Sequence, residues 1–180
     1  MRVADCMVEI LKTEGVQFVA GVPGDDLLSL FDALYDHPEI RLILTRHEQA
    51  GVYMADGYAR SSGEPGVAFA SKGPGRSNTY AAIVNAFTDC VPLVVIFSQG
   101  TQKYLGKGML QEVPYLDSFA SIAKWSFSVP SPDRVPEAFR RAFNVARSGR
   151  PGPVILELYG ETLRANIDEP VYHKTRRIRF

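Results

Sequence analysis

Residues 66–75 read GVAFASKGPG, a short apolar run followed by a polar loop that is built around Gly73-Pro74-Gly75. A run of this length with glycine at its boundaries is typical of a strand that is buried on both faces. Such strands occur in parallel sheets, because helices cover both faces of those sheets. The stretch therefore predicts a central strand over Gly66–Ala70 in an α/β fold.

Similar apolar runs lie on both sides of this stretch. The other strand candidates are Val16–Gly21, Arg41–Thr45, Leu93–Phe97, Trp125–Val129 and Val154–Leu158. Helical spacing of apolar residues predicts a first helix that ends at Gly15, and further helices over 27–35, Glu48–Ser62, Ser77–Cys90 and Pro136–Ser148. This alternation predicts a three-layer open sheet of about six parallel strands, with helices on both faces.

Composition narrows the function classes. The 180 residues suffice for one ordinary domain, and the 20 basic residues balance the 20 acidic ones, so no basic surface points to nucleic acid. No apolar run is long enough to span a membrane, and no signal peptide is visible at the N-terminus. Cys6 and Cys90 match neither a zinc spacing nor a disulfide framework. We expect a reduced, cytoplasmic protein with no membrane, nucleic-acid or metal-binding segment of its own.

The unusual residues gather in the loops that follow the predicted strands. These loops are Gly21–Asp26, Arg46–Glu48, Ser71–Arg76 and Ser98–Thr101. The carboxyl ends of parallel strands share one edge of a sheet, and ligands of open α/β sheets bind at that edge. The sequence therefore predicts a functional site there.

Several common site motifs are incomplete in these loops. The dinucleotide fingerprint fails at Asn78, which stands where its third glycine is required, and the spacing from Gly100 to Gly106 is one residue too long for a P-loop. Gly51 replaces the second histidine of a zinc-protease helix, and no G-x-S-x-G occurs. The usual nucleotide, zinc and serine-hydrolase interpretations are thereby excluded.

A different set of motifs is complete and in order. It comprises Gly21-Val22-Pro23-Gly24, Arg46-His47-Glu48-Gln49-Ala50, Met54–Arg60, Gly73-Pro74-Gly75 with Asn78, Leu110-Gln111-Glu112-Val113 and Gly149–Val154. From about Ala4 to Leu158, the chain resembles the pyrimidine-binding (PYR) domain of thiamine-diphosphate enzymes, in the acetolactate synthase-like group. The resemblance implies the thiamine diphosphate-binding fold, with a PYR domain over 1–163. Residues 164–180 are then a basic, solvated tail or the start of a linker.

The resemblance gives Glu48 the catalytic role. In that family, a glutamate bonded to N1′ of the aminopyrimidine favours the imino tautomer, whose 4′-nitrogen takes the proton from C2 of the cofactor. A carboxyl group in an apolar cleft suits this task, because desolvation there lets it keep and share a proton. The alternative is that Glu48, as an acid at the beginning of a helix, only complements the helix dipole, which is worth about 0.3–1 kcal/mol.

The resemblance also implies cofactor-binding residues, namely Pro23, Gly24, Glu48, Pro74, Asn78 and Gln111. Each has a plainer alternative: an ordinary strand–helix turn for Pro23 and Gly24, a helix cap for Ser77 or Asn78, and a solvated loop amide for Gln111. Asp25 matches a working aspartate of the 2-oxo acid decarboxylases, but their paired histidines have no counterpart here. We therefore expect Asp25 to be a helix N-cap.

Two features limit what the resemblance implies. Lys72, Arg76 and Ser77 replace small residues that are common around the family's Gly-Pro-Gly, which leaves the substrate open. The G-D-G motif of the second cofactor domain, which binds Mg²⁺ and diphosphate, is absent. We therefore expect the pyrimidine half of a thiamine-diphosphate-dependent transferase or lyase that acts on 2-oxo acids and pairs as a homodimer, inactive without a diphosphate-binding domain. The alternatives are a freestanding PYR subunit of a two-chain decarboxylase, of the sulfopyruvate or phosphonopyruvate type, and a non-catalytic binding module.

Overall fold

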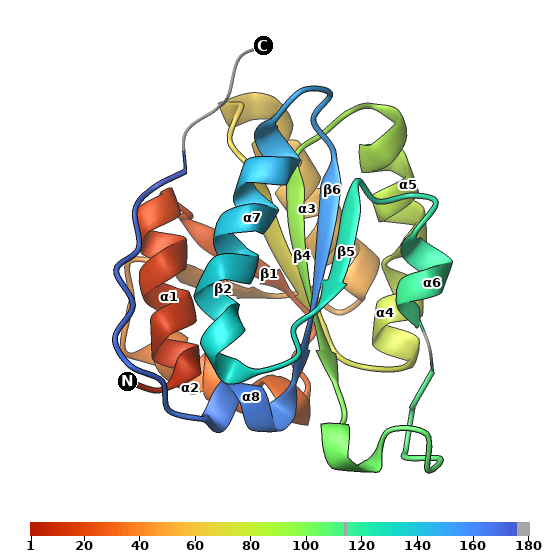
Figure 1. Ribbon diagram of the computed structural model, residues 1–180. Coiled ribbons are helices and arrows are strands. Elements are labelled where there is room, and N and C mark those ends of the chain that lie inside the picture. Colours follow the sequence, from red (N-terminus) through yellow and green to blue (C-terminus); the bar gives the residue numbers. More distant parts are fainter. Residues whose placement is uncertain (114, 176–180) are drawn as a thin grey trace.

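The computed structural model describes residues 1–113 and 115–175, and within them the chain forms one six-stranded sheet (Figure 1). The strands are β1 (Phe18–Gly21), β2 (Arg41–Leu44), β3 (Gly66–Ala70), β4 (Leu93–Gln99), β5 (Trp125–Ser128) and β6 (Pro153–Tyr159). Every neighbouring pair is parallel, in the order β2-β1-β3-β4-β6-β5. The predicted α/β class and all six predicted strands are confirmed, with boundaries that differ by at most two residues.

Helices cover both faces of the sheet (Figure 1). One face carries α1 (Val3–Glu14), α2 (Leu28–Tyr35), α7 (Val135–Arg147) and α8 (Gly160–Arg164), and the other carries α3 (Glu48–Ser62), α4 (Pro74–Asn78), α5 (Tyr80–Thr88) and α6 (Tyr115–Phe119). Short 3-10 helices span Asp25–Leu27, Gln102–Tyr104 and Pro132–Arg134. Across the described residues, no helix combines the length and apolar character needed to cross a membrane.

The alternation of side chains along β4 explains the three layers. Val94 and Ile96 belong to one buried cluster, together with the apolar faces of α1 and α7. Val95 and Phe97 belong to the other cluster, together with residues of α3 and α5. Because successive side chains of a strand point to opposite faces, one apolar strand holds helices on both sides.

Two of the predicted helices end where the structure places them, and a third predicted helix is divided in two. Gly15 caps α1 with a φ of +85°, and α3 has the predicted bounds. The predicted single helix Ser77–Cys90 is wrong, because the chain forms α4 and α5 instead. Thr79 donates its N–H and its hydroxyl to the Arg76 carbonyl oxygen (2.9 and 2.6 Å), so the turn at Thr79 tightens and interrupts the helix.

The segment that follows α8 makes specific contacts with the rest of the domain within the described residues. It runs alongside α1 (Figure 1), and the Met1 and Ile167 backbones exchange hydrogen bonds of 3.0 Å. Further on, Tyr172 Oη donates to the Glu14 carboxylate (2.8 Å). This segment therefore supplies donors to a buried acid, while Val171, His173 and Lys174 stay exposed. That residues 164–180 form a basic tail or the start of a linker stays a prediction. The basic residues Arg176, Arg177 and Arg179 lie outside the described residues.

Candidate functional site

The sheet order places its topological switch point between the ends of β1 and β3. From β1 the chain continues outward to β2, whereas from β3 it continues to β4 on the other side. Loops that leave neighbouring strands in opposite directions open a crevice in which ligands bind. The two loops meet closely, since a Cβ atom added to Gly24 would lie 2.5 Å from Ser71 Cβ. Glycine is thus required for this approach.

Helix α3 delivers Glu48 to the same edge. His47 precedes the helix, and its Nδ1 accepts a hydrogen bond from the Gln49 N–H (3.2 Å). The helix lies close against the sheet, because a Cβ added to Gly51 would be 2.8 Å from Gly21 Cα. This packing leaves Glu48 only 9 % exposed. Glu48 is therefore a buried acid in the first turn of α3, a position that both the catalytic and the helix-dipole interpretation allow.

Asn78 of α4 contacts Glu48 of α3. Its Nδ2 donates to Glu48 Oε2 at 2.9 Å. Within the described part of the chain no donor reaches Oε1, and a Cβ added to Gly75 would lie 3.3 Å from that oxygen. One carboxylate oxygen is thus fixed by Asn78, and the other lies close to the Gly75 backbone, where a side chain would also crowd Ser71 Oγ. Asn78 and Ser77 lie inside α4, so neither is the cap that was offered as an alternative.

The remaining predicted residues line the same edge with different exposure. Pro23 and Pro74 are exposed on the loops after β1 and β3. Gln111 is exposed and has a φ of +61°, and its side chain begins directly over Gly73, where an added Cβ would collide with Gln111 Cβ. The structure therefore brings these loops together around Glu48. The role of each residue in holding a cofactor stays a prediction.

The buried acid after β1 is Asp26, and Asp25, which the sequence analysis singled out, is exposed. Gly24 holds the N-cap position of the 3-10 helix, so the prediction of an Asp25 cap is wrong, and the Asp25 side chain is 86 % exposed. Asp26 is the buried acid and pairs with Lys72 Nζ. Burial by itself raises the pKa of Asp26, but contacts with Asp25, Lys72 and Ser98 outweigh it and lower that pKa to about 2. Asp26 therefore stays ionised beside Lys72 at neutral pH.

A cavity of about 310 Å³ adjoins this ion pair. It is lined by Asp25, Asp26, Lys72, Gln99, Gly100, Thr101, Met109, Leu110, Gly160 and Arg164. The cavity combines charged groups from the loops after β1 and β3 with apolar side chains from the segment after β4. Space for a small polar molecule is thus present beside the candidate site.

Arg76 forms a buried ion pair that was not predicted. Its guanidinium is fully buried and pairs with the Glu157 carboxylate from β6. The signal was present in the sequence, because Glu157 interrupts the apolar run Val154–Leu158. A charge in a buried strand requires an ionic or hydrogen-bonding partner.

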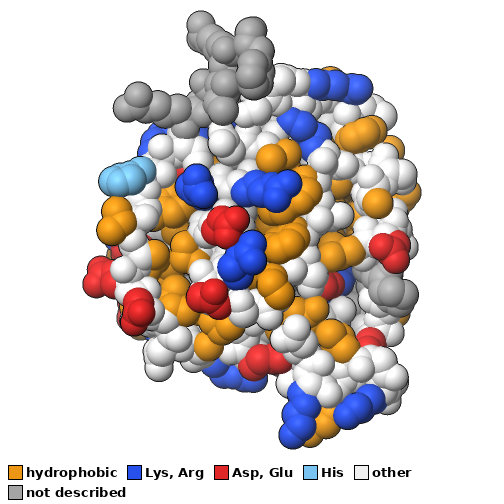
Figure 2. Space-filling view, in the orientation of Figure 1, with side chains coloured by type: hydrophobic (Ala, Val, Ile, Leu, Met, Phe, Trp, Pro, Cys, Tyr) orange, Lys and Arg blue, Asp and Glu red, His pale blue; other side chains and the backbone are white. Residues whose placement is uncertain are grey.

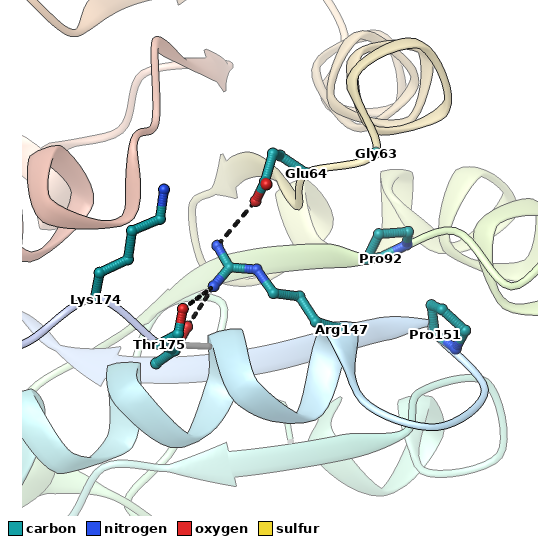
Figure 3. A pocket seen from close by; sticks show the side chains of 7 residues that line it. All are labelled: Gly63, Glu64, Pro92, Arg147, Pro151, Lys174 and Thr175. Atoms are coloured by element: carbon teal, nitrogen blue, oxygen red, sulfur yellow. Dashed lines mark hydrogen bonds and ion pairs between the residues drawn. The ribbon is translucent and has the colours of Figure 1, made fainter. Parts of the chain in front are cut away.

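A second cavity lies at the opposite edge of the sheet and has another character (Figure 3). Its volume is about 270 Å³, and Gly63, Glu64, Pro92, Arg147, Pro151, Lys174 and Thr175 line it. Arg147 donates to Glu14 Oε2 (2.7 Å) and to the Thr175 carbonyl (3.2 Å), and its Nη2 lies 3.3 Å from Glu64. These contacts fasten the C-terminal segment to the ends of α1 and α7, away from Glu48.

The close approach of the first and third loops gives a testable prediction. We expect Gly24→Ala to destabilise the fold by about 1–3 kcal/mol, because the new methyl group overlaps Ser71. The matched control is Gly57→Ala in α3, where an added Cβ meets no atom within 4 Å. Alanine there is expected to stabilise the helix by about 0.5–1 kcal/mol. Urea denaturation of both variants checks the pair, and equal shifts would contradict the tight contact.

Comparison with known proteins agrees with the geometry. The chain matches the family described as thiamine pyrophosphate enzyme, N-terminal TPP binding domain, over residues 1–121. It is 40% identical over 172 residues to a probable acetolactate synthase large subunit of Methanocaldococcus jannaschii, covering 96% of this chain and 29% of that protein. It is 40% identical over 167 residues to the acetolactate synthase large subunit of Haemophilus influenzae, covering 93% and 29%. The chain thus spans less than a third of the length of these relatives.

Proposed function

The chain belongs to the thiamine pyrophosphate enzyme N-terminal TPP-binding domain family, and from this membership we propose that it supplies the pyrimidine-binding half of an active site that acts on 2-oxo acids. The reaction is carboligation or decarboxylation, as in an acetolactate synthase-like transferase or lyase. The similarity to the acetolactate synthase large subunits of Methanocaldococcus jannaschii and Haemophilus influenzae supports this class. We assign the PYR domain to 1–163 and the segment from 164 onward to a basic tail or the start of a linker.

The observation that carries the proposal is the environment of Glu48. Its Oε2 is held by Asn78, and within the described residues no donor reaches its Oε1. We assign Oε1 to the contact with the aminopyrimidine ring, because this oxygen is left without a hydrogen bond from the protein and lies beside Gly75. When bound, the cofactor supplies a carbon nucleophile toward the carbonyl group of a 2-oxo acid. Glu48 holds and returns a proton at Oε1, while Asn78 keeps the carboxylate oriented.

The other predicted residues lie on separate loops at the same edge of the sheet. Pro23 and Gly24 belong to the loop after β1, which approaches Ser71, and Pro74 begins α4. Gln111 approaches Gly73. We assign these residues to holding the ring, since the family places its cofactor contacts there and the loops lie close to one another. The diphosphate group and Mg²⁺ require ligands from a second domain.

Cofactor binding by the 180-residue chain tests the half-site proposal. We expect calorimetric titration with thiamine diphosphate and Mg²⁺ to give weak or undetectable binding and no turnover of 2-oxo acids. The reason is that the diphosphate anchor is supplied elsewhere. Adding a chain that carries a diphosphate-binding domain is expected to restore binding. A micromolar dissociation constant for the chain alone would contradict the proposal.

Association is the second expectation. Exposed apolar side chains lie on α3 and α5, where Tyr53 and Tyr80 are 42 % and 40 % exposed, and Leu110 is 80 % exposed on the segment after β4. That segment projects as a lobe where basic and apolar side chains mix (Figures 1 and 2). Apolar surface of this kind favours a protein partner. We propose pairing of two copies with two-fold symmetry. A strict monomer in sedimentation at high concentration would contradict the pairing.

A further inference from the structure

Two buried ion pairs connect residues 72–78 to neighbouring elements of the fold. Lys72 pairs with Asp26, with side chains 15 % and 4 % exposed, and Arg76 pairs with Glu157, with side chains 0 % and 8 % exposed. The proton chemistry proposed for Glu48 uses neither pair. Burying two charges costs desolvation energy that their attraction only partly offsets, so such pairs contribute little net stability. Their geometry indicates a role in placing the backbone.

Both pairs converge on Ser98, near the end of β4. The Arg76 guanidinium donates to the Ser98 carbonyl oxygen, with Nε at 2.9 Å. The Ser98 hydroxyl donates to the Asp26 carboxylate and accepts from the Lys72 N–H at 3.1 Å. One residue of a central strand thus joins the loop after β1 to the loop after β3.

Glu157 is held from its other side as well. Its Oε1 accepts from the Ser128 hydroxyl of β5 (2.8 Å), and its Oε2 lies 3.4 Å from Gln99 Nε2. Because the carboxylate is fixed by β4 and β5, the guanidinium that binds it has one available orientation. The network therefore ties α4 to the three strands β4, β5 and β6.

We propose that Arg76 and Glu157, supported by Lys72 and Asp26, clamp the Gly73–Asn78 segment and thereby orient the Glu48 carboxylate through Asn78. Helix α4 has five residues, so it contains few internal hydrogen bonds and needs anchoring from outside. Arg76 and Asn78 both lie on this helix, and Asn78 donates to Glu48. Arg76 is thus a positioning residue. Only the last step, from Glu48 to the cofactor ring, rests on the proposed function.

The test replaces the Arg76 pair with an apolar one, as Arg76→Met/Glu157→Leu. Removing both charges leaves no unpaired charge in the interior, so we expect the fold to be retained. Hydrogen exchange in the 180-residue chain, without cofactor, is expected to become at least about tenfold faster at the amides of 73–79. Amides of β3 and β6 are expected to keep their protection. The matched control is Arg134→Met/Glu137→Leu, an exposed pair on another element that leaves exchange at 73–79 unchanged.

Exchange at 73–79 within twofold of the unmodified chain would overturn the clamp and leave the ion pair a purely structural contact. If the first variant does not fold, Lys72→Met/Asp26→Asn tests the other pair by the same measurement. A second readout adds a diphosphate-binding partner chain. There the dissociation constant of thiamine diphosphate is expected to rise about tenfold at unchanged melting temperature. Faster exchange with an unchanged dissociation constant would overturn only the proposed link from Arg76 to Glu48. If the unmodified chain and its partner chain together fail to bind thiamine diphosphate, that result would count against the proposed function instead.

Discussion

We expect Glu48→Gln to lower turnover by about 10²–10⁴-fold when a diphosphate-binding domain is present, and to leave the melting temperature nearly unchanged. This is the usual range for loss of a general acid–base group. Glutamine keeps the size of the side chain, and its amide oxygen still accepts the hydrogen bond from Asn78. The amide group that then stands at the position of Oε1 does not titrate, so the proton transfer is lost while the packing remains.

Turnover and melting temperature are measured on the same Glu48→Gln protein. If Glu48 only complements the helix dipole, the pattern is reversed, with a small loss of stability and normal turnover. The matched control is Glu137→Gln, because Glu137 is another acid in the first turn of a helix but is 52 % exposed. Normal turnover of Glu48→Gln would remove Glu48 from the mechanism and with it the main support for the half-site.

Arg147→Met is expected to destabilise the fold by about 3–5 kcal/mol, the range for breaking a buried ion pair from one side. The partner Glu14 has a fully buried side chain, so its carboxylate loses its counter-charge without access to water. Tyr172 Oη and the Thr175 N–H continue to donate to it, at 2.8 and 2.9 Å. The loss also frees Thr175 from Arg147, and the C-terminal segment loosens from α1.

Urea denaturation and the melting temperature check this prediction. For a domain of this size the loss corresponds to a decrease of roughly 6–20 °C. The double variant Glu14→Leu/Arg147→Met is the control, because it removes both charges and is expected to cost clearly less than the single change. A loss below about 1 kcal/mol in Arg147→Met would show that the hydrogen bonds to Glu14 suffice without the charge.

The elements themselves were predictable because their signals are local. β3 was predicted with its observed bounds from five residues between glycine and a polar loop, and α3 was predicted from Glu48 to Ser62. Helical and strand periodicities operate over a few residues, so neighbouring letters suffice. The break at Thr79 was missed, because a side chain that bonds a carbonyl three residues earlier leaves no trace in the periodicity.

The sequence by itself determined the fold class, and it predicted a site at one edge of the sheet with Glu48 as its principal acid. Only the tertiary structure decided which side chains meet there. Asn78 reaches Glu48 across 30 residues, and Arg76 reaches Glu157 across 81. Those pairings depend on the strand order β2-β1-β3-β4-β6-β5, which follows from the packing of the whole chain. Local patterns define each strand but leave the identity of its neighbours open, so the partners of buried charges became known only with the sheet assembled.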